Sequence, residues 1–159
     1  MNQKVKKLVE KFTIFNNEML TIVQSCSNKD WQKVCEGEQW TVGVVAHHVA
    51  AGHYSSLDLV KMIVAGETLP PLTMDTVDRM NVTHAQEHAD CTRAEVLSLL
   101  RKNGAAFANY LEGLSEADLA RTGYLAAIDG DVSAQQFVEM IILHSAGDHL
   151  TNIKTAIAP

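Results

Sequence analysis

Apolar residues recur every three or four positions along four long segments of the chain. The segments are 2–25, 41–65, 92–114 and 134–155. This period is that of one face of an α-helix, so each segment is predicted to be an amphipathic helix. The stripes comprise Val5, Leu8, Val9, Phe12, Phe15, Met19, Ile22 and Val23; then Val45, Val49, Leu57, Val60 and Val64; then Val96, Leu100, Phe107, Tyr110, Leu111 and Leu114; and finally Phe137, Met140, Ile141 and His144.

Start and stop signals agree with these limits. Thr41 is a good N-cap for the second helix, and Gly66 followed by Pro70-Pro71 ends it. The sequences Thr92-Arg-Ala-Glu95 and Ser133-Ala-Gln-Gln136 have the form of capping boxes, so the third and fourth helices are expected to begin there.

The connecting segments carry weaker signals. Residues 30–36 favour a short turn of helix ended by Gly37, and residues 73–90 favour a helix that is polar all round. Ser115 opens another short turn, and residues 122–132 favour a loop with a brief extended piece. Four long amphipathic helices without a convincing set of strands predict an all-α fold, a four-helix bundle with short extra helices in the connections. We expect one domain over residues 1–159.

Composition narrows the class of protein. Of 159 residues, 47% are hydrophobic and 20% charged, which is typical of a globular chain. Nineteen acidic residues against thirteen basic ones give a net charge of −6, which disfavours nucleic-acid binding because phosphates need a basic face. No apolar run is long enough to span a membrane, and no signal peptide is visible. Three cysteines without a C-x-x-C spacing favour a reduced, cytoplasmic protein.

Histidine is the residue type whose number is most unusual, with seven in the chain. His48 shares a helix face with Val45 and Val49, and His144 continues the apolar stripe of the last helix. Imidazole is the commonest metal ligand, and bundles place metal sites in their cores from facing helices. The alternative is that these histidines only pack in the core.

His149 is a third candidate ligand, but its spacing from His144 is i, i+5. On a regular α-helix such side chains point about 140° apart and do not meet on one ion. Two interpretations stay open. Asp148, at i+4 from His144, is an alternative oxygen ligand; or a π-bulge near Gly147 brings His149 round to His144.

The other histidines have weaker patterns. His47 lies about 100° round the helix from His48, and His53 follows five positions later, so both are pocket candidates near the mouth of the site. His84 and His88 have the i, i+4 spacing of a metal site, but their segment is polar, which favours a solvated face. Neither H-E-x-x-H nor E-x-x-H occurs, so zincin and di-iron patterns are absent.

Two motifs resemble the DinB/YfiT-like family. The first is Trp40-Thr-Val-Gly-Val-Val-Ala-His-His48-Val, and the second runs from Val132-Ser-Ala-Gln-Gln-Phe to His144-Ser-Ala-Gly-Asp-His149. The resemblance implies a four-helix bundle, often a homodimer. It also implies one divalent metal ion (Zn, Ni or Fe) held by one histidine of the second helix and two of the last. Carried over by position, the ligands are His48, His144 and His149, although the family usually spaces the last two as H-x-x-x-H.

Bundles similar to this one include thiol-dependent S-transferases, so the resemblance implies a metal-dependent enzyme. A low-molecular-weight thiol would occupy the open metal position and attack an electrophilic small molecule, or the ion would acidify a water for hydrolysis. Two other functions compete: a non-catalytic metal-binding or stress-response bundle, and a helical interaction module whose histidines only pack.

Overall fold

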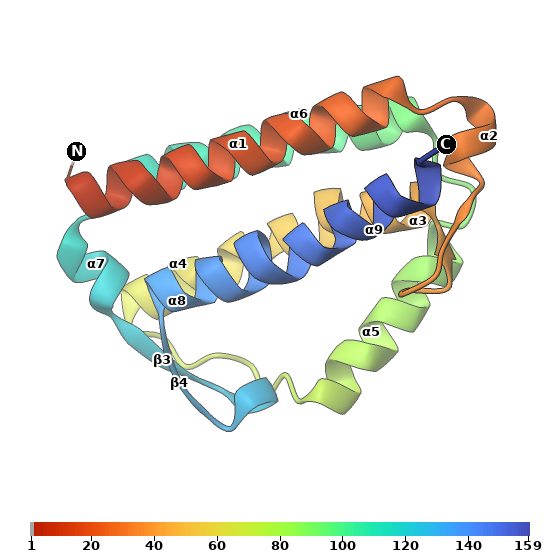
Figure 1. Cartoon of the computed structure of the whole chain (residues 1–159). Helices are drawn as coiled ribbons and strands as arrows, with labels where there is room; N and C mark the ends of the chain where they lie inside the picture. Colours follow the sequence, from red (N-terminus) through yellow and green to blue (C-terminus); the bar gives the residue numbers. More distant parts are fainter. Residues whose placement is uncertain (1) are drawn as a thin grey trace.

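The computed structural model describes residues 2–159 and has four long helical segments packed around one core (Figure 1). The all-α four-helix bundle predicted from the sequence is confirmed. Two of the four segments are broken by π-helix. In order, they are α1 (Gln3–Ser25); α3 (Val42–His47), η1 (His48–His53) and α4 (Leu57–Ala65); α6 (Arg93–Glu112); and α8 (Ala134–Val138), η3 (Glu139–Ala146) and α9 (Gly147–Ile157).

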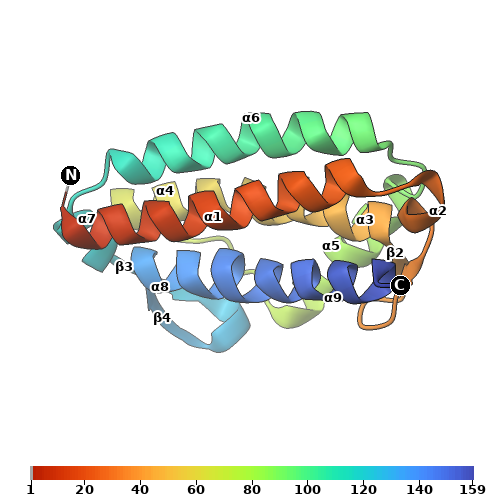
Figure 2. The same cartoon turned by 45° about the horizontal axis from the view of Figure 1, so that its top comes forward.

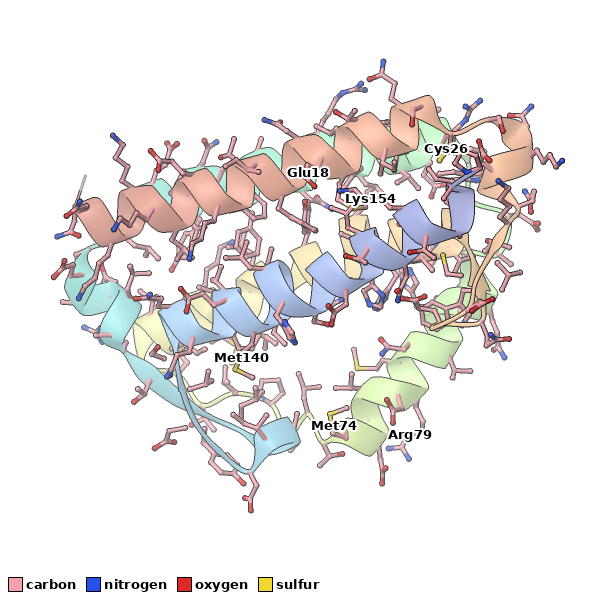
Figure 3. All side chains as sticks on the ribbon, viewed as in Figure 1. Glu18, Cys26, Met74, Arg79, Met140 and Lys154 are labelled. Atoms are coloured by element: carbon pink, nitrogen blue, oxygen red, sulfur yellow. The ribbon has the colours of Figure 1, made fainter. Side chains whose placement is uncertain are left out.

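The order of helices around the bundle differs from their order in the chain. Helix α1 lies along α6, as Figure 2 shows, and it also contacts η3 and α9. The second segment likewise packs between α6 and the last segment, through α3 and η1. Lys154 of α9 donates to Glu18 of α1 at 2.9 Å, which links the last segment to the first (Figure 3). The second and last segments are therefore direct neighbours, which allows their side chains to form one site.

The apolar stripes form the core. Phe12, Tyr54 and Phe107 are fully buried and pack against one another: Phe12 and Phe107 stack with ring centroids 4.8 Å apart, and Tyr54 is tilted against Phe12 at 5.4 Å. The Tyr54 hydroxyl donates to Asn16 Oδ1 at 2.7 Å, which satisfies its polar end inside the bundle. This aromatic cluster fixes the second segment against α1 and α6.

Two small hairpins occupy the connections, and here the sequence expectation needs correction. Helix α2 covers only Asn28–Trp31, and the residues after it form β1 (Val34–Cys35), which pairs with β2 (Trp40–Thr41). After α7 (Glu116–Ala120), strands β3 (Thr122–Leu125) and β4 (Gly130–Ser133) pair around η2 (Ala126–Ile128). Strands this short carry too few residues for an alternating pattern to reveal them.

Helix α5 (Met74–Glu87) lies outside the group of four, at one side of the bundle (Figure 1). It is polar, as predicted, and none of its residues is fully buried. It contacts η1, the π-helical part of the second segment, and its His84 ring packs against His47 of α3. Within residues 2–159, no helix is long and apolar enough to cross a membrane.

Candidate metal centre

The π-helical turn η1 brings His48 and His53 to the same face of the second segment. These residues are five apart, and a π-helix hydrogen-bonds each residue to the one five positions on. Their ring centroids are 4.7 Å apart with planes at 74°. On a regular α-helix the two rings would point about 140° apart. The local change of helix type therefore brings these two rings together.

His149 of α9 completes a cluster of three imidazoles, called here the first triad (His48, His53 and His149). Its ring centroid lies 5.2 Å from that of His48 and 5.0 Å from that of His53, again with steeply tilted planes. Imidazoles bind zinc at about 2.0–2.1 Å, which puts centroids on a tetrahedral ion roughly 5 Å apart. The spacing of the first triad fits that arrangement.

Hydrogen bonds fix the rings of His53 and His149 through Nδ1, and each ring keeps its Nε2 free for another partner. His53 Nδ1 donates to the carbonyl of Ile141 at 3.0 Å, and His149 Nδ1 donates to Glu38 Oε1 at 2.6 Å. Because carbonyl and carboxylate oxygens only accept, each Nδ1 carries the proton and each Nε2 keeps its lone pair. Within residues 2–159, His53 Nε2 and His48 Nδ1 are buried without a hydrogen-bond partner. A buried nitrogen without a partner is costly, and a cation bound among the three rings would satisfy His53 Nε2.

Burial keeps the rings of His48 and His53 neutral, which is the form that binds metal. Burial, with smaller contributions from the neighbouring His53 and His149, lowers the pKa of His48 to about 2. Burial and the neighbouring His149 lower the pKa of His53 to about 4.

Glu38 reaches the first triad from the β1–β2 hairpin, and the sequence analysis missed it. Its side chain is 8% exposed, and Oε1 also accepts from Asn152 Nδ2 of α9 at 2.8 Å. Gly37 permits this docking, because a Cβ there would lie 2.8 Å from Asn152 Nδ2. Gly37 was expected only to end a helix. No local pattern links Glu38 to the last helix, so only the folded chain reveals the contact.

Gly52 lets the His48 ring lie flat along its own helix, and we expect Gly52→Ala to disturb the first triad. A Cβ at Gly52 would sit 2.8 Å from His48 Nδ1, so the ring must move. The cost should be about 1–2 kcal/mol of unfolding free energy. Gly147→Ala is the matched control, because nothing lies within 4 Å of its Cβ position and its φ is −63°. There, alanine should stabilise by about 0.5–1 kcal/mol. Urea unfolding measures both, and equal effects would contradict the expectation.

The structure brings some of the predicted site residues together and separates others. His48 and His149 meet, and the pocket candidate His53 joins them. His144 does not: its side chain is 82% exposed, 3.9 Å from Asp148 Oδ2, which is itself exposed. A π-segment does occur in the last helix, but η3 ends at Ala146 and Gly147 resumes α-helical geometry. The ring of His144 therefore points away from His149, and neither His144 nor Asp148 reaches the first triad.

The second pocket candidate, His47, lies in another cluster, the second triad (His47, His84 and His88). His47 is 2% exposed, and its Nδ1 lies 3.0 Å from His84 Nε2. Its ring stacks on that of His88 with centroids 3.9 Å apart. The expectation that His84 and His88 lie on a solvated face is wrong, because α5 turns both rings toward His47 and both are partly buried.

Comparison with known proteins places the chain in a family. The model of the DinB superfamily matches residues 12–151. The solved structure of YfiT from Bacillus subtilis, described as a probable metal-dependent hydrolase with an unusual four-helix bundle topology, is similar with a TM-score of 0.79. The two chains are 14% identical over 98% of this chain and 87% of that chain, a likeness of fold alone. No curated protein matches. Since the matching region covers most of its length, the chain belongs to the DinB superfamily.

Proposed function

We propose that this protein is a metal-dependent enzyme whose ion is bound by His48, His53 and His149. The observation that carries the proposal is the convergence of three imidazoles, two of which have a buried nitrogen without a partner. Three nitrogen ligands suit a divalent transition metal such as Zn, Ni or Fe better than Mg or Ca. Relative to the sequence-based ligand set, His53 takes the place of His144.

Three protein ligands leave a coordination position open for a reactant. A metal ion held by the first triad would lower the pKa of a thiol or a water molecule at this open position. We propose a low-molecular-weight thiol as the reactant and an electrophilic small molecule as its partner. The transfer forms a bond from the thiol sulfur to the electrophilic carbon, the leaving group departs with its bonding electrons, and the thiol proton passes to solvent.

The chain itself contributes orientation and a low-dielectric wall. Glu38 holds His149 by Nδ1 and Ile141 holds His53 by Nδ1, so both rings present Nε2. Trp40 packs its ring edge-on to His48, with centroids 5.4 Å apart, and covers the site from the hairpin. Hydrolysis is the second candidate function, and the description of YfiT as a probable metal-dependent hydrolase favours it.

Metal analysis followed by turnover assays tests the proposal. Tag-free protein, purified without added metal, should contain a divalent transition metal by mass spectrometry or take up zinc or nickel on titration. The loaded protein should then couple cysteine, glutathione or a related thiol to a chromogenic electrophile, and the chelated protein should not. Thiol-independent cleavage of an activated ester would favour hydrolysis. Loading without any turnover would leave a metal-binding bundle, and failure to bind metal would overturn the proposal.

Glu38→Gln should weaken metal binding at the first triad by about 10–100-fold, the range typical of removing a carboxylate that orients a ligating histidine. Glutamine keeps the shape and an accepting oxygen but loses the charge that makes His149 a better donor. Glu36→Gln is the matched control, since Glu36 lies on the same hairpin with an exposed side chain. Competition with a chromophoric chelator measures both affinities. Equal affinities in the two variants would show that Glu38 only packs.

A further inference from the structure

The second triad has no role in the proposed function, although it lies directly beside the first triad. His47 directly precedes His48 in the second segment, and the ring centroids of His48 and His84 are only 5.3 Å apart. We propose that His47, His84 and His88 bind a second divalent transition metal ion, with Glu95 positioning His47. This inference does not depend on the first triad being occupied.

The ligand nitrogens of the second triad are already gathered. One ring nitrogen from each histidine lies within 4.8 Å of the others. His84 lies in α5 and His88 is the C-cap residue four positions later, so the two rings lie side by side with centroids 4.5 Å apart. The stacked rings of His47 and His88 are closer than any pair in the first triad. An ion would therefore tilt the His88 ring out of the stack, and its partly exposed position at the end of α5 leaves room for this.

Glu95 provides an independent sign that His47 is prepared as a ligand. The sequence predicts a capping box in which Glu95 would bond back to the backbone N–H of Thr92. Only half of it forms: Thr92 Oγ1 accepts from the Glu95 backbone N–H at 3.2 Å. The Glu95 carboxylate instead lies 3.3 Å from His47 Nε2. In the matching box at Ser133, Gln136 does close the ring, at 2.9 Å.

The position of Glu95 determines which nitrogen of His47 can bind metal. A carboxylate on Nε2 holds the proton there and leaves the lone pair on Nδ1. Nδ1 is the nitrogen that faces His84 Nε2, at 3.0 Å. This is the carboxylate–histidine arrangement found around ligating histidines, and Glu38 makes the same arrangement with His149 in the first triad.

A metal at the second triad would also explain how α5 is held. This helix has no fully buried residue, so apolar burial contributes little to its docking on η1. The contact of this helix with the bundle is made in part by His84 and His88, whose rings pack against the buried His47. An ion would connect α5 to the second segment. Glu95 of α6 would be connected to the ion through its contact with His47. Imidazole ligands point to Zn, Ni, Cu or Co rather than Mg or Ca.

The test is metal stoichiometry of tag-free, chelator-stripped protein after titration with zinc and dialysis. The wild type should retain two ions per chain, and His84→Ala/His88→Ala should retain one. His53→Ala/His149→Ala should retain the other ion, and His144→Ala, an exposed histidine of the same bundle, should retain both. Glu95→Gln should weaken the second ion by about 10–100-fold and leave the first unchanged. Circular dichroism confirms that each variant is folded, and α5 carries no core residue whose loss would unfold the bundle.

A further readout is amide hydrogen exchange. Zinc should slow exchange in α5 in the wild type but not in His84→Ala/His88→Ala. The proposal is overturned if that variant retains as much zinc as the wild type, or if no zinc is retained by any chain. If the wild type retains a single ion that His84→Ala/His88→Ala loses and His53→Ala/His149→Ala keeps, the second site stands and the proposed function fails.

Discussion

Alanine at His53 is expected to lower the zinc affinity of the first triad by at least about 100-fold, whereas alanine at His144 should leave it unchanged. Loss of a ligand removes a bond to the ion and should cost more than the roughly 10–100-fold typical of an outer carboxylate. His53 is buried with Nε2 aimed into the triad, and His144 is 82% exposed beside Asp148. The two variants therefore separate the ligand set of the structure from that expected by sequence resemblance.

The measurement is best made where only one site can fill. Chelator competition in the His84→Ala/His88→Ala background reports the first triad alone. His53→Leu accompanies His53→Ala, because leucine fills a similar volume without a ligand atom and separates metal loss from a cavity. Both should bind zinc equally weakly. If His144→Ala loses the ion and His53→Ala retains it, the last helix must turn on metal binding to bring His144 inward.

The fold could be predicted because its signals are local. The stripes around Phe12, Val60, Phe107 and Phe137 mark buried helix faces directly, and Thr41 caps its helix through a bond to the Val44 backbone N–H. Spacing and capping depend on residues within one turn of each other. The polar helix near His84 was also found, since helical character does not require burial.

The site could be predicted only in part because its assembly is not local. Residues five apart do meet on a π-helix, but the sequence pattern points to His144 and His149 as that pair. The π-turn that aligns such a pair lies instead at His48 and His53. Where a helix widens depends on packing with its neighbours, and here both neighbouring segments, η1 and η3, widen where they meet.

Contacts that cross between elements were beyond any pattern in the sequence. Glu38 lies more than a hundred residues before His149, and nothing nearby announces a metal-site carboxylate. Likewise, nothing in the polar segment around His84 and His88 indicates that these residues contact the buried His47. The one local hint was Glu95 in a capping box, and its failure to close is visible only in three dimensions.

Zinc at the first triad is expected to raise the melting temperature by roughly 5–10 °C when free zinc is about 100 times the dissociation constant. An ion that binds only the native state at that ratio adds about 2.7 kcal/mol. For a chain of this size, 1 kcal/mol corresponds to about 2–4 °C. The physical basis is that the ion satisfies His53 Nε2, which is buried without a partner, and ties η1 to α9. Calorimetry of His84→Ala/His88→Ala with and without zinc measures the shift for this site alone. Adding His48→Ala and His149→Ala to that background should abolish the shift, since only His53 of the first triad remains. An undiminished shift there would mean that zinc stabilises the bundle from elsewhere, and the first triad would then be a packed cluster of histidines.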